Sequence, residues 1–270
     1  MKVVLFCGGF GMRMRGGASD ALPKPMQLVG SQPLLWHVMR YYAHFGHTEF
    51  ILCLGYGADR IKQFFLDYRE TSANDFRLHQ GEVELLSTDM SHWDITFVNT
   101  GLQSGLEERL LRVRPFLEGE EMFLANYADV LCDVDLNLLV ERMAAHPTAV
   151  ASLLAVPPQS SFHVLEMADA EADSAATDGA ALVSHIRPIS EQPIWENGGY
   201  LVLRQEIFDW LKVGENWVDY TFANLAAEGR MLAQRHTGFW KPADTFKERA
   251  ELDEMWTRGE RPWAPREPSS

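Results

Sequence analysis

The sequence predicts an α/β protein built on a doubly wound, mostly parallel β-sheet, with a smaller β-rich region in its C-terminal half. Through the first 156 residues, short apolar runs alternate with segments of helical periodicity. The apolar runs are nearly continuous, which is typical of parallel strands that are buried on both faces. A length of 270 residues and an apolar fraction of 46% are sufficient for one large domain with an ordinary core.

The elements of the first half follow from these patterns in order. Each expected strand is an apolar run that ends near glycine or a polar residue, and each expected helix has apolar residues at a spacing of three and four. The expected strands span residues 2–7, 49–57, 94–101, 121–130 and 148–156. The expected helices span residues 34–46, 58–70, 106–117 and 136–146.

The second half has fewer helical segments. The expected elements are strands at 161–168, 181–189 and 197–204, and a helix at 222–230. The acidic, alanine-rich segment 169–180 is expected to be an exposed hairpin loop. We expect a single domain over residues 1–262, with halves 1–150 and 151–262, followed by a flexible proline-rich tail at 263–270.

Charge and cysteine content limit what the protein binds and where it acts. The formal net charge of −14 argues against nucleic acids and membranes as partners, because nucleic acids and anionic membranes require a basic surface. No apolar run approaches the length of a membrane span. Cys7, Cys53 and Cys132 form no CxxC pair, so free thiols in a reducing, cytoplasmic compartment are expected.

A glycine-rich turn that also carries positive charge follows the first strand. Gly8, Gly9 and Gly11 are followed by Arg13. Backbone N–H groups that converge in such a turn can bind phosphate, although a plain glycine turn has the same composition. The turn lacks the Gly-Lys pair of a Walker loop, and Met14 stands where a dinucleotide fingerprint needs its third glycine. A hydride-transfer enzyme is therefore disfavoured.

The next distinctive segment is LPKPM, residues 22–26. Pro23 and Pro25 fix the backbone on both sides of Lys24 and favour an extended backbone at Leu22 and at Lys24 itself. A lysine in such a segment has limited freedom in where its ammonium points. An isolated Pro-Lys-Pro is most often an ordinary surface loop. Here a functional role is favoured because the motif follows the glycine turn, with Arg13 11 residues before Lys24.

Together, this glycine turn and lysine resemble the signature of the sugar-1-phosphate nucleotidylyltransferases, and of the glucose-1-phosphate cytidylyltransferases in particular. The resemblance extends from Lys2 to about Trp263. The segments that carry it are PKPMQLVGSQPLLWHVMRYYAHFG, ILCLGYGADRIKQFF, VNTG, FLANYADV, NGGYLVL and GFWKPADTFKERAELDEMWTRGERPW. The family implies a Rossmann-like sheet of the nucleotide-diphospho-sugar transferase type, in which residues 1–150 bind nucleotide and residues 151–262 bind the sugar.

The resemblance also implies roles for individual residues. Lys24 and Arg13 would be the catalytic cations, at the α-phosphate and at the triphosphate. The implied nucleotide-binding residues are Gly8, Gly9, Gly11, Met12, Arg13, Thr100, Arg109 and Tyr127. The implied residues for the sugar phosphate are Glu191, Gln192, Asn197 and Gly198. Asp129 and Asp244 would hold Mg²⁺, an ion that takes oxygen ligands and usually one or two carboxylates.

The sequence departs from the family pattern at several of these positions. Met12 replaces a threonine, and Gln192 replaces the lysine expected to hold the phosphate of the sugar. The family's Tyr-Gly-Asp-Gly reads Tyr127-Ala128-Asp129-Val130 here, and Tyr220-Thr221 replaces a Glu-Pro pair. Loss of the lysine charge weakens a phosphate contact, because charge-assisted hydrogen bonds are about twice as strong as neutral ones. These departures cluster around the acceptor side, so the sequence supports the nucleotidyl chemistry and leaves the acceptor open.

The expected activity is nucleotidyl transfer from a nucleoside triphosphate to glucose 1-phosphate or a related phosphate. The expected nucleoside triphosphate is CTP. The expected products are an NDP-sugar and pyrophosphate, and a homo-oligomer is expected as in relatives. Three alternatives remain open from the sequence: another nucleotide or a non-glucose acceptor, a nucleotide-binding relative without catalysis, and a dinucleotide-dependent oxidoreductase.

Overall fold

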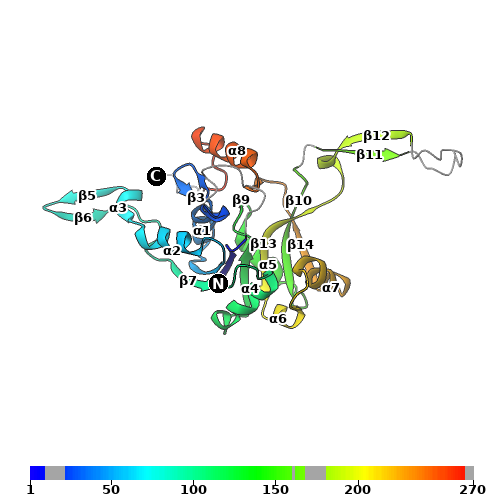
Figure 1. Ribbon diagram of the computed structural model, residues 1–270, viewed down its shortest axis with the longest axis horizontal. Helices are drawn as coiled ribbons and strands as arrows, with labels where there is room; N and C mark the ends of the chain where they lie inside the picture. The colour runs from blue at the N-terminus through cyan, green and yellow to red at the C-terminus, as the bar shows by residue number, and fades with distance from the viewer. Residues whose placement is uncertain (10–21, 160–161, 168–180, 265–270) are drawn as a thin grey trace.

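The computed structural model describes residues 1–9, 22–159, 162–167 and 181–264. Within them, a seven-stranded sheet has the strand order β14-β10-β13-β8-β1-β4-β7 (Figure 1). Its strands are β1 (Val3–Phe6), β4 (Glu49–Leu54), β7 (Asp94–Asn99), β8 (Met122–Asn126), β10 (Ala151–Val156), β13 (Glu196–Arg204) and β14 (Met231–Arg235). The pairs β1–β4, β1–β8, β4–β7 and β10–β14 are parallel, whereas β13 is antiparallel to both of its neighbours. The doubly wound, mostly parallel α/β fold is confirmed.

Helices cover both faces of the sheet, which explains the continuous apolar runs in its strands. Along β1, the side chains of Val3 and Leu5 enter one core and those of Val4 and Phe6 enter the other. Residues of α1 (Leu34–His44), α2 (Ala58–Asp67), α5 (Leu136–Ala144) and α8 (Phe246–Thr257) pack in the first core. Residues of α4 (Leu106–Val113), α6 (Ile207–Trp210), η7 (Trp217–Phe222) and α7 (Ala223–Ala227) pack in the second.

Shorter elements complete the described residues. They are α3 (Glu70–Ala73), the 3₁₀ turns η3 (Lys24–Met26), η4 (Arg114–Leu117) and η6 (Ile189–Glu191), and four two-stranded sheets. These sheets pair β2 (Leu28–Val29) with β3 (Gln32–Pro33), β5 (Phe76–His79) with β6 (Glu82–Leu85), β9 (Val130–Cys132) with β15 (Trp240–Pro242), and β11 (His163–Met167) with β12 (Val183–Pro188). The β5–β6 and β11–β12 hairpins project from the body on opposite sides (Figure 1).

The structure departs from the sequence expectations in several places, among them the strand β14, which was not expected. The β5–β6 hairpin has no buried residue and therefore shows no apolar face in the sequence. The helix α8 buries only Leu252, so its periodic signal is weak. Lys24 begins a 3₁₀ turn instead of continuing an extended segment, because the Met26 N–H donates to the Pro23 carbonyl at 2.8 Å and closes the turn. The strand expected over 121–130 ends at Asn126, and a turn separates it from β9.

The C-terminal end of the described chain is packed. Trp263, expected at the start of a flexible tail, is 1% exposed and its ring lies 5.4 Å from that of Phe239. Trp263 is therefore not part of a flexible tail. Residues 265–270 and the whole of the expected loop at 169–180 lie outside the described residues. None of the helices in the described ranges has both the length and the apolarity that a membrane crossing requires.

Candidate active site

The glycine turn begins at the carboxyl end of β1, where ligands bind in sheets of this class. Gly8 is buried and Gly9 is exposed. The remaining expected residues of the turn, Gly11, Met12 and Arg13, lie outside the described residues.

A buried arginine fixes Gly8 in place. Arg109, from α4, is 4% exposed and donates to the Gly8 carbonyl at 2.8 Å, to Thr100 Oγ1 at 2.9 Å and to the Ser104 carbonyl at 3.1 Å. Burial lowers the pKa of its guanidinium. A Cβ on Gly8 would overlap this guanidinium, so glycine is required there by close packing. Arg109 therefore ties the ends of β1 and β7 together beneath the turn, a positioning role that the sequence does not reveal.

A cavity of about 370 Å³ opens beside this turn. Its lining residues include Gly8, Gly9, Lys24, Arg109, Tyr127 and Asp129. Thr100, a further residue expected to contact nucleotide, is fully buried beneath it and donates from Oγ1 to the Leu54 carbonyl at 2.9 Å. The expected catalytic lysine and four of the expected nucleotide-binding residues thus line one cavity.

A second cavity, of about 700 Å³, adjoins the first, and Tyr127 and Asp129 line both. It also contains Asn197 and Asp244. The Asn197 side chain donates to the Tyr127 hydroxyl at 3.1 Å and accepts from the Gly199 N–H at 3.0 Å. Two ligand-sized spaces therefore meet at the Tyr127–Asp129 turn.

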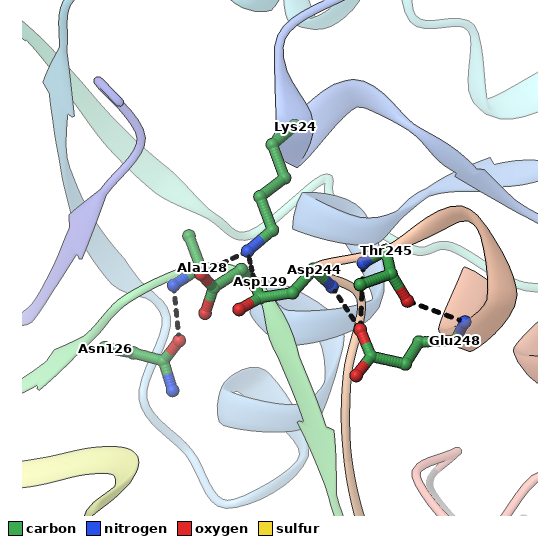
Figure 2. A network of polar contacts seen from close by, with 7 residues as sticks. All are labelled: Lys24, Asn126, Ala128, Asp129, Asp244, Thr245 and Glu248. Atoms are coloured by element: carbon green, nitrogen blue, oxygen red, sulfur yellow. Dashed lines mark hydrogen bonds and ion pairs between the residues drawn. The ribbon is translucent and has the colours of Figure 1, made fainter. Parts of the chain in front are cut away.

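Lys24 joins the two expected metal-binding aspartates at this meeting point. Its Nζ lies 2.7 Å from Asp129 Oδ2 and also contacts Asp244 Oδ1 (Figure 2). Asp129 follows β8, Asp244 follows β15, and Lys24 begins η3, so three distant segments converge on one point. The Lys24 side chain is 18% exposed, which leaves its ammonium largely shielded from water.

The charges in this cluster depend on each other. Burial lowers the pKa of Lys24, but the neighbouring Asp129 and Asp244 carboxylates outweigh burial and raise this pKa above its usual value. Burial raises the pKa of Asp129, and the Lys24 ammonium opposes that shift. Loss of either partner would leave an uncompensated charge in a partly buried site.

The donor set fits a hard divalent cation. Two carboxylates from different segments point at the same ammonium, so both already face one cationic position. Mg²⁺ takes oxygen ligands, commonly one or two carboxylates with phosphate and water. The residues that would hold Mg²⁺ are thus Asp129 and Asp244.

A capping box at the start of α8 holds Asp244 in place. The Glu248 carboxylate accepts from the N–H groups of Asp244 at 2.9 Å and Thr245 at 2.8 Å, while Thr245 Oγ1 accepts from the Glu248 N–H (Figure 2). The Thr-x-x-Glu spacing of residues 245–248 is a sequence signal for this box. The same helix binds the segment that follows Lys24, because the Gly30 N–H donates to Asp253 Oδ1 at 2.7 Å and Arg249 donates to Gln27 Oε1 at 2.5 Å.

The turn that presents Asp129 contains an unusual alanine. Ala128 has a φ of 60°, in the left-handed region that favours glycine, and glycine is the residue that the family pattern has here. Its N–H donates to Asn126 Oδ1 at 2.7 Å, a bond within the buried turn (Figure 2). The alanine Cβ is thus a local source of strain beside Asp129.

Ala128→Gly is expected to raise the free energy of unfolding by about 0.5–1 kcal/mol, because relief of the left-handed strain exceeds the added entropy of the unfolded chain. Denaturant unfolding at neutral pH measures this change. Ala226→Gly, within the helix α7, is the matched control and should lower the same free energy by about 1 kcal/mol. Equal losses in both variants would show that Ala128 is unstrained.

The residues expected to hold the sugar phosphate are divided between two places. Asn197 lines the second cavity. Glu191 ends η6, Gln192 caps it, and Gly198 is buried with its carbonyl accepting from Trp240 Nε1 at 2.8 Å. Neither Glu191 nor Gln192 is among the residues that line the two cavities, whereas Lys241 and Lys247, which the sequence did not indicate, line the second.

One further polar cluster lies outside both cavities. Ligand atoms of Cys132, Asp133 and His236 lie within 4.8 Å of one another. His236 Nε2 is already 2.9 Å from Asp133 Oδ1 and 3.2 Å from the Phe239 carbonyl, and burial raises the pKa of the Cys132 thiol. These contacts link the loop that follows β9 to the loop that precedes β15.

Comparison with known proteins identifies relatives over nearly the whole chain. No family model matches the sequence. A Bacillus subtilis (strain 168) protein described as "Probable glucose-1-phosphate cytidylyltransferase" is 36% identical over 269 residues, covering 97% of this chain and 99% of that protein. Glucose-1-phosphate cytidylyltransferase of Salmonella typhimurium (strain LT2) is 30% identical over 269 residues, with 97% and 98% coverage.

Solved structures share the fold at lower identity. A UTP-bound UGPase from Acinetobacter baumannii has a TM-score of 0.67 and 19% identity, covering 94% of this chain and 92% of that one. A UDP-glucose pyrophosphorylase complexed with UDP-glucose has a TM-score of 0.66 and 15% identity, with coverage of 96% and 98%. At these identities the similarity supports the architecture alone.

Proposed function

Because the chain belongs to the glucose-1-phosphate cytidylyltransferase family, we propose that it transfers a cytidylyl group from CTP to glucose 1-phosphate, with CDP-glucose and pyrophosphate as products. The observation that carries this proposal is the Lys24–Asp129–Asp244 cluster, which lies where two ligand-sized cavities meet. Family membership removes the oxidoreductase alternative.

We assign the 370 Å³ cavity to the nucleotide and the 700 Å³ cavity to the acceptor. The backbone at Gly8 and Gly9, positioned by Arg109, borders the nucleotide phosphates, and Arg13 is assigned to the triphosphate. Tyr127 and Asn197, which are hydrogen-bonded to each other, orient the sugar at the boundary. This assignment brings the two reacting phosphates together at Lys24 and Asp129.

In the reaction, an oxygen of the acceptor phosphate attacks the α-phosphorus of CTP. A new P–O bond forms, and the bond between the α-phosphorus and the bridging oxygen of pyrophosphate breaks. No general base is needed, because the attacking oxygen is already ionised near neutral pH. Lys24 neutralises charge that builds on the α-phosphate, which is the main task of a protein in phosphoryl-type transfer. Mg²⁺, held by Asp129 and Asp244, would supply additional charge neutralisation.

Two further assignments complete the proposal. Cys7, Cys53 and Cys132 are buried free thiols, as expected of a protein from a reducing compartment, so we place the enzyme in the cytoplasm. The projecting hairpins expose large apolar side chains, including Leu78 at 66% and Ile186 at 62%, which fits burial against another copy in a homo-oligomer. Light scattering of the purified chain measures that state.

The test is release of pyrophosphate in the presence of Mg²⁺, with CTP, UTP, dTTP, GTP and ATP each combined with a panel of sugar 1-phosphates and polyol phosphates. Release with CTP and glucose 1-phosphate is the expected result. Release with CTP and a different acceptor would keep the nucleotidyl chemistry and change the substrate. Nucleotide binding without pyrophosphate release across the panel would favour a non-catalytic relative, the second candidate suggested by Met12 and Gln192.

A further inference from the structure

The acceptor's phosphate needs a cation, and the described structure offers one at an unexpected position. The family pattern assigns this contact to a lysine at position 192, but the residue there is a neutral glutamine outside the residues that line the second cavity. Two lysines from elsewhere in the chain, Lys241 and Lys247, line that cavity.

Of these two lysines, Lys241 is held in a defined position. It is the middle residue of β15 and pairs with Leu131 of β9, the strand that directly follows Asp129. Its side chain is 19% exposed, and its Nζ lies 2.5 Å from Glu251 Oε2. Lys247 is 80% exposed and lies 3.9 Å from the other oxygen of Glu251, so its ammonium is poorly fixed.

The charge of the cavity makes a fixed ammonium necessary. Five carboxylate residues line it: Asp129, Glu196, Asp244, Glu248 and Glu251. A phosphate dianion that enters such a space is repelled unless a cation meets it. An ammonium has three N–H donors, so Lys241 can keep its bond to Glu251 and still donate to a phosphate oxygen.

We propose that Lys241 binds the phosphate of the acceptor, in the role that the family pattern gives to a lysine at position 192. Lys241 and Asp244 are three residues apart on the segment that leads into α8, so this contact would place the acceptor phosphate beside the metal-binding carboxylates. The inference rests on the proposed function and specifies which side chain selects a phosphorylated acceptor.

Lys241→Met tests the assignment, because methionine keeps an apolar stem of similar length and removes the charge. The KM for glucose 1-phosphate is expected to rise about 10–100-fold, while kcat and the KM for CTP change less than about twofold. Lys241→Arg should recover part of the loss, because it keeps a cation. Lys247→Met is the matched control, and its KM for the acceptor should change less than about threefold because that side chain is exposed.

A binding measurement separates failure of this inference from failure of the proposed function. Calorimetric titration of glucose 1-phosphate into the full chain with Mg²⁺, without CTP, should show binding that Lys241→Met weakens and Lys247→Met does not. Loss of affinity only in Lys241→Met would support the inference even if no nucleotide were turned over. An unchanged acceptor affinity and KM in a folded, active Lys241→Met would overturn the inference and leave the proposed function standing. No binding by the wild-type chain, together with no release of pyrophosphate from CTP and glucose 1-phosphate, would overturn both.

Discussion

Lys24→Ala is expected to lower kcat by about 10²–10³-fold with CTP and glucose 1-phosphate, because one positioned donor to the developing charge is removed. The structure shows which contacts the substitution removes. The Lys24 ammonium contacts Asp129 and Asp244, and both contacts are lost together. The remaining carboxylates repel each other and also the incoming phosphates.

The measurement for this variant is steady-state pyrophosphate release, accompanied by thermal unfolding to confirm that the chain is folded. Removal of the ammonium leaves the partly buried Asp129 without its partner, so some loss of stability is expected beside the loss of rate. Lys212→Ala is the matched control, because Lys212 forms an exposed pair with Glu215 and its loss should leave kcat unchanged. A folded Lys24→Ala with nearly normal kcat would remove Lys24 from the chemistry.

Asp129→Asn is expected to lower kcat by about 100-fold or more and to raise the Mg²⁺ concentration needed for half-maximal rate. Asparagine keeps the size of the side chain but loses the charge that attracts both Mg²⁺ and Lys24. Because one change weakens two attractions, the rate and the affinity for Mg²⁺ should fall together.

Titration of activity with Mg²⁺ in Asp129→Asn and in wild type provides the comparison. Asp59→Asn, an exposed residue in the first turn of α2, serves as a control for loss of one negative charge. If Asp129→Asn lost activity but kept the wild-type Mg²⁺ titration, Asp129 would be a structural residue of the turn and Mg²⁺ would be held elsewhere.

Every strand of the large sheet except β14, and the helices α1, α2, α4, α5 and α7, could be predicted because their signals are local. The run Val3–Phe6 is buried on both faces and reads as a central strand without any tertiary knowledge. The hairpin β5–β6 and the helix α8 could not be predicted, because exposed or weakly amphipathic segments leave little periodic pattern.

The site was only partly predictable for a different reason. Lys24, Asp129 and Asp244 were expected from the family resemblance, and the structure places them in contact. Their convergence depends on contacts between residues 105 and 220 positions apart, which no local pattern encodes. For the same reason, the sequence did not reveal that Arg109 is buried or that Lys241 lines the second cavity.

The distance along the chain between Lys24 and Asp244 has a consequence for synthesis. Proteins are made from the N-terminus, and segments fold as they emerge from the ribosome. The strands of the N-terminal half can form early, but Asp244 and the helix that positions it are made after all the strands of the large sheet. A nascent or truncated chain that ends before Asp244 can therefore complete most of the sheet without having a working catalytic centre. Under the proposed function, nucleotidyl transfer is expected only from chains that extend through Asp244 and the helix α8.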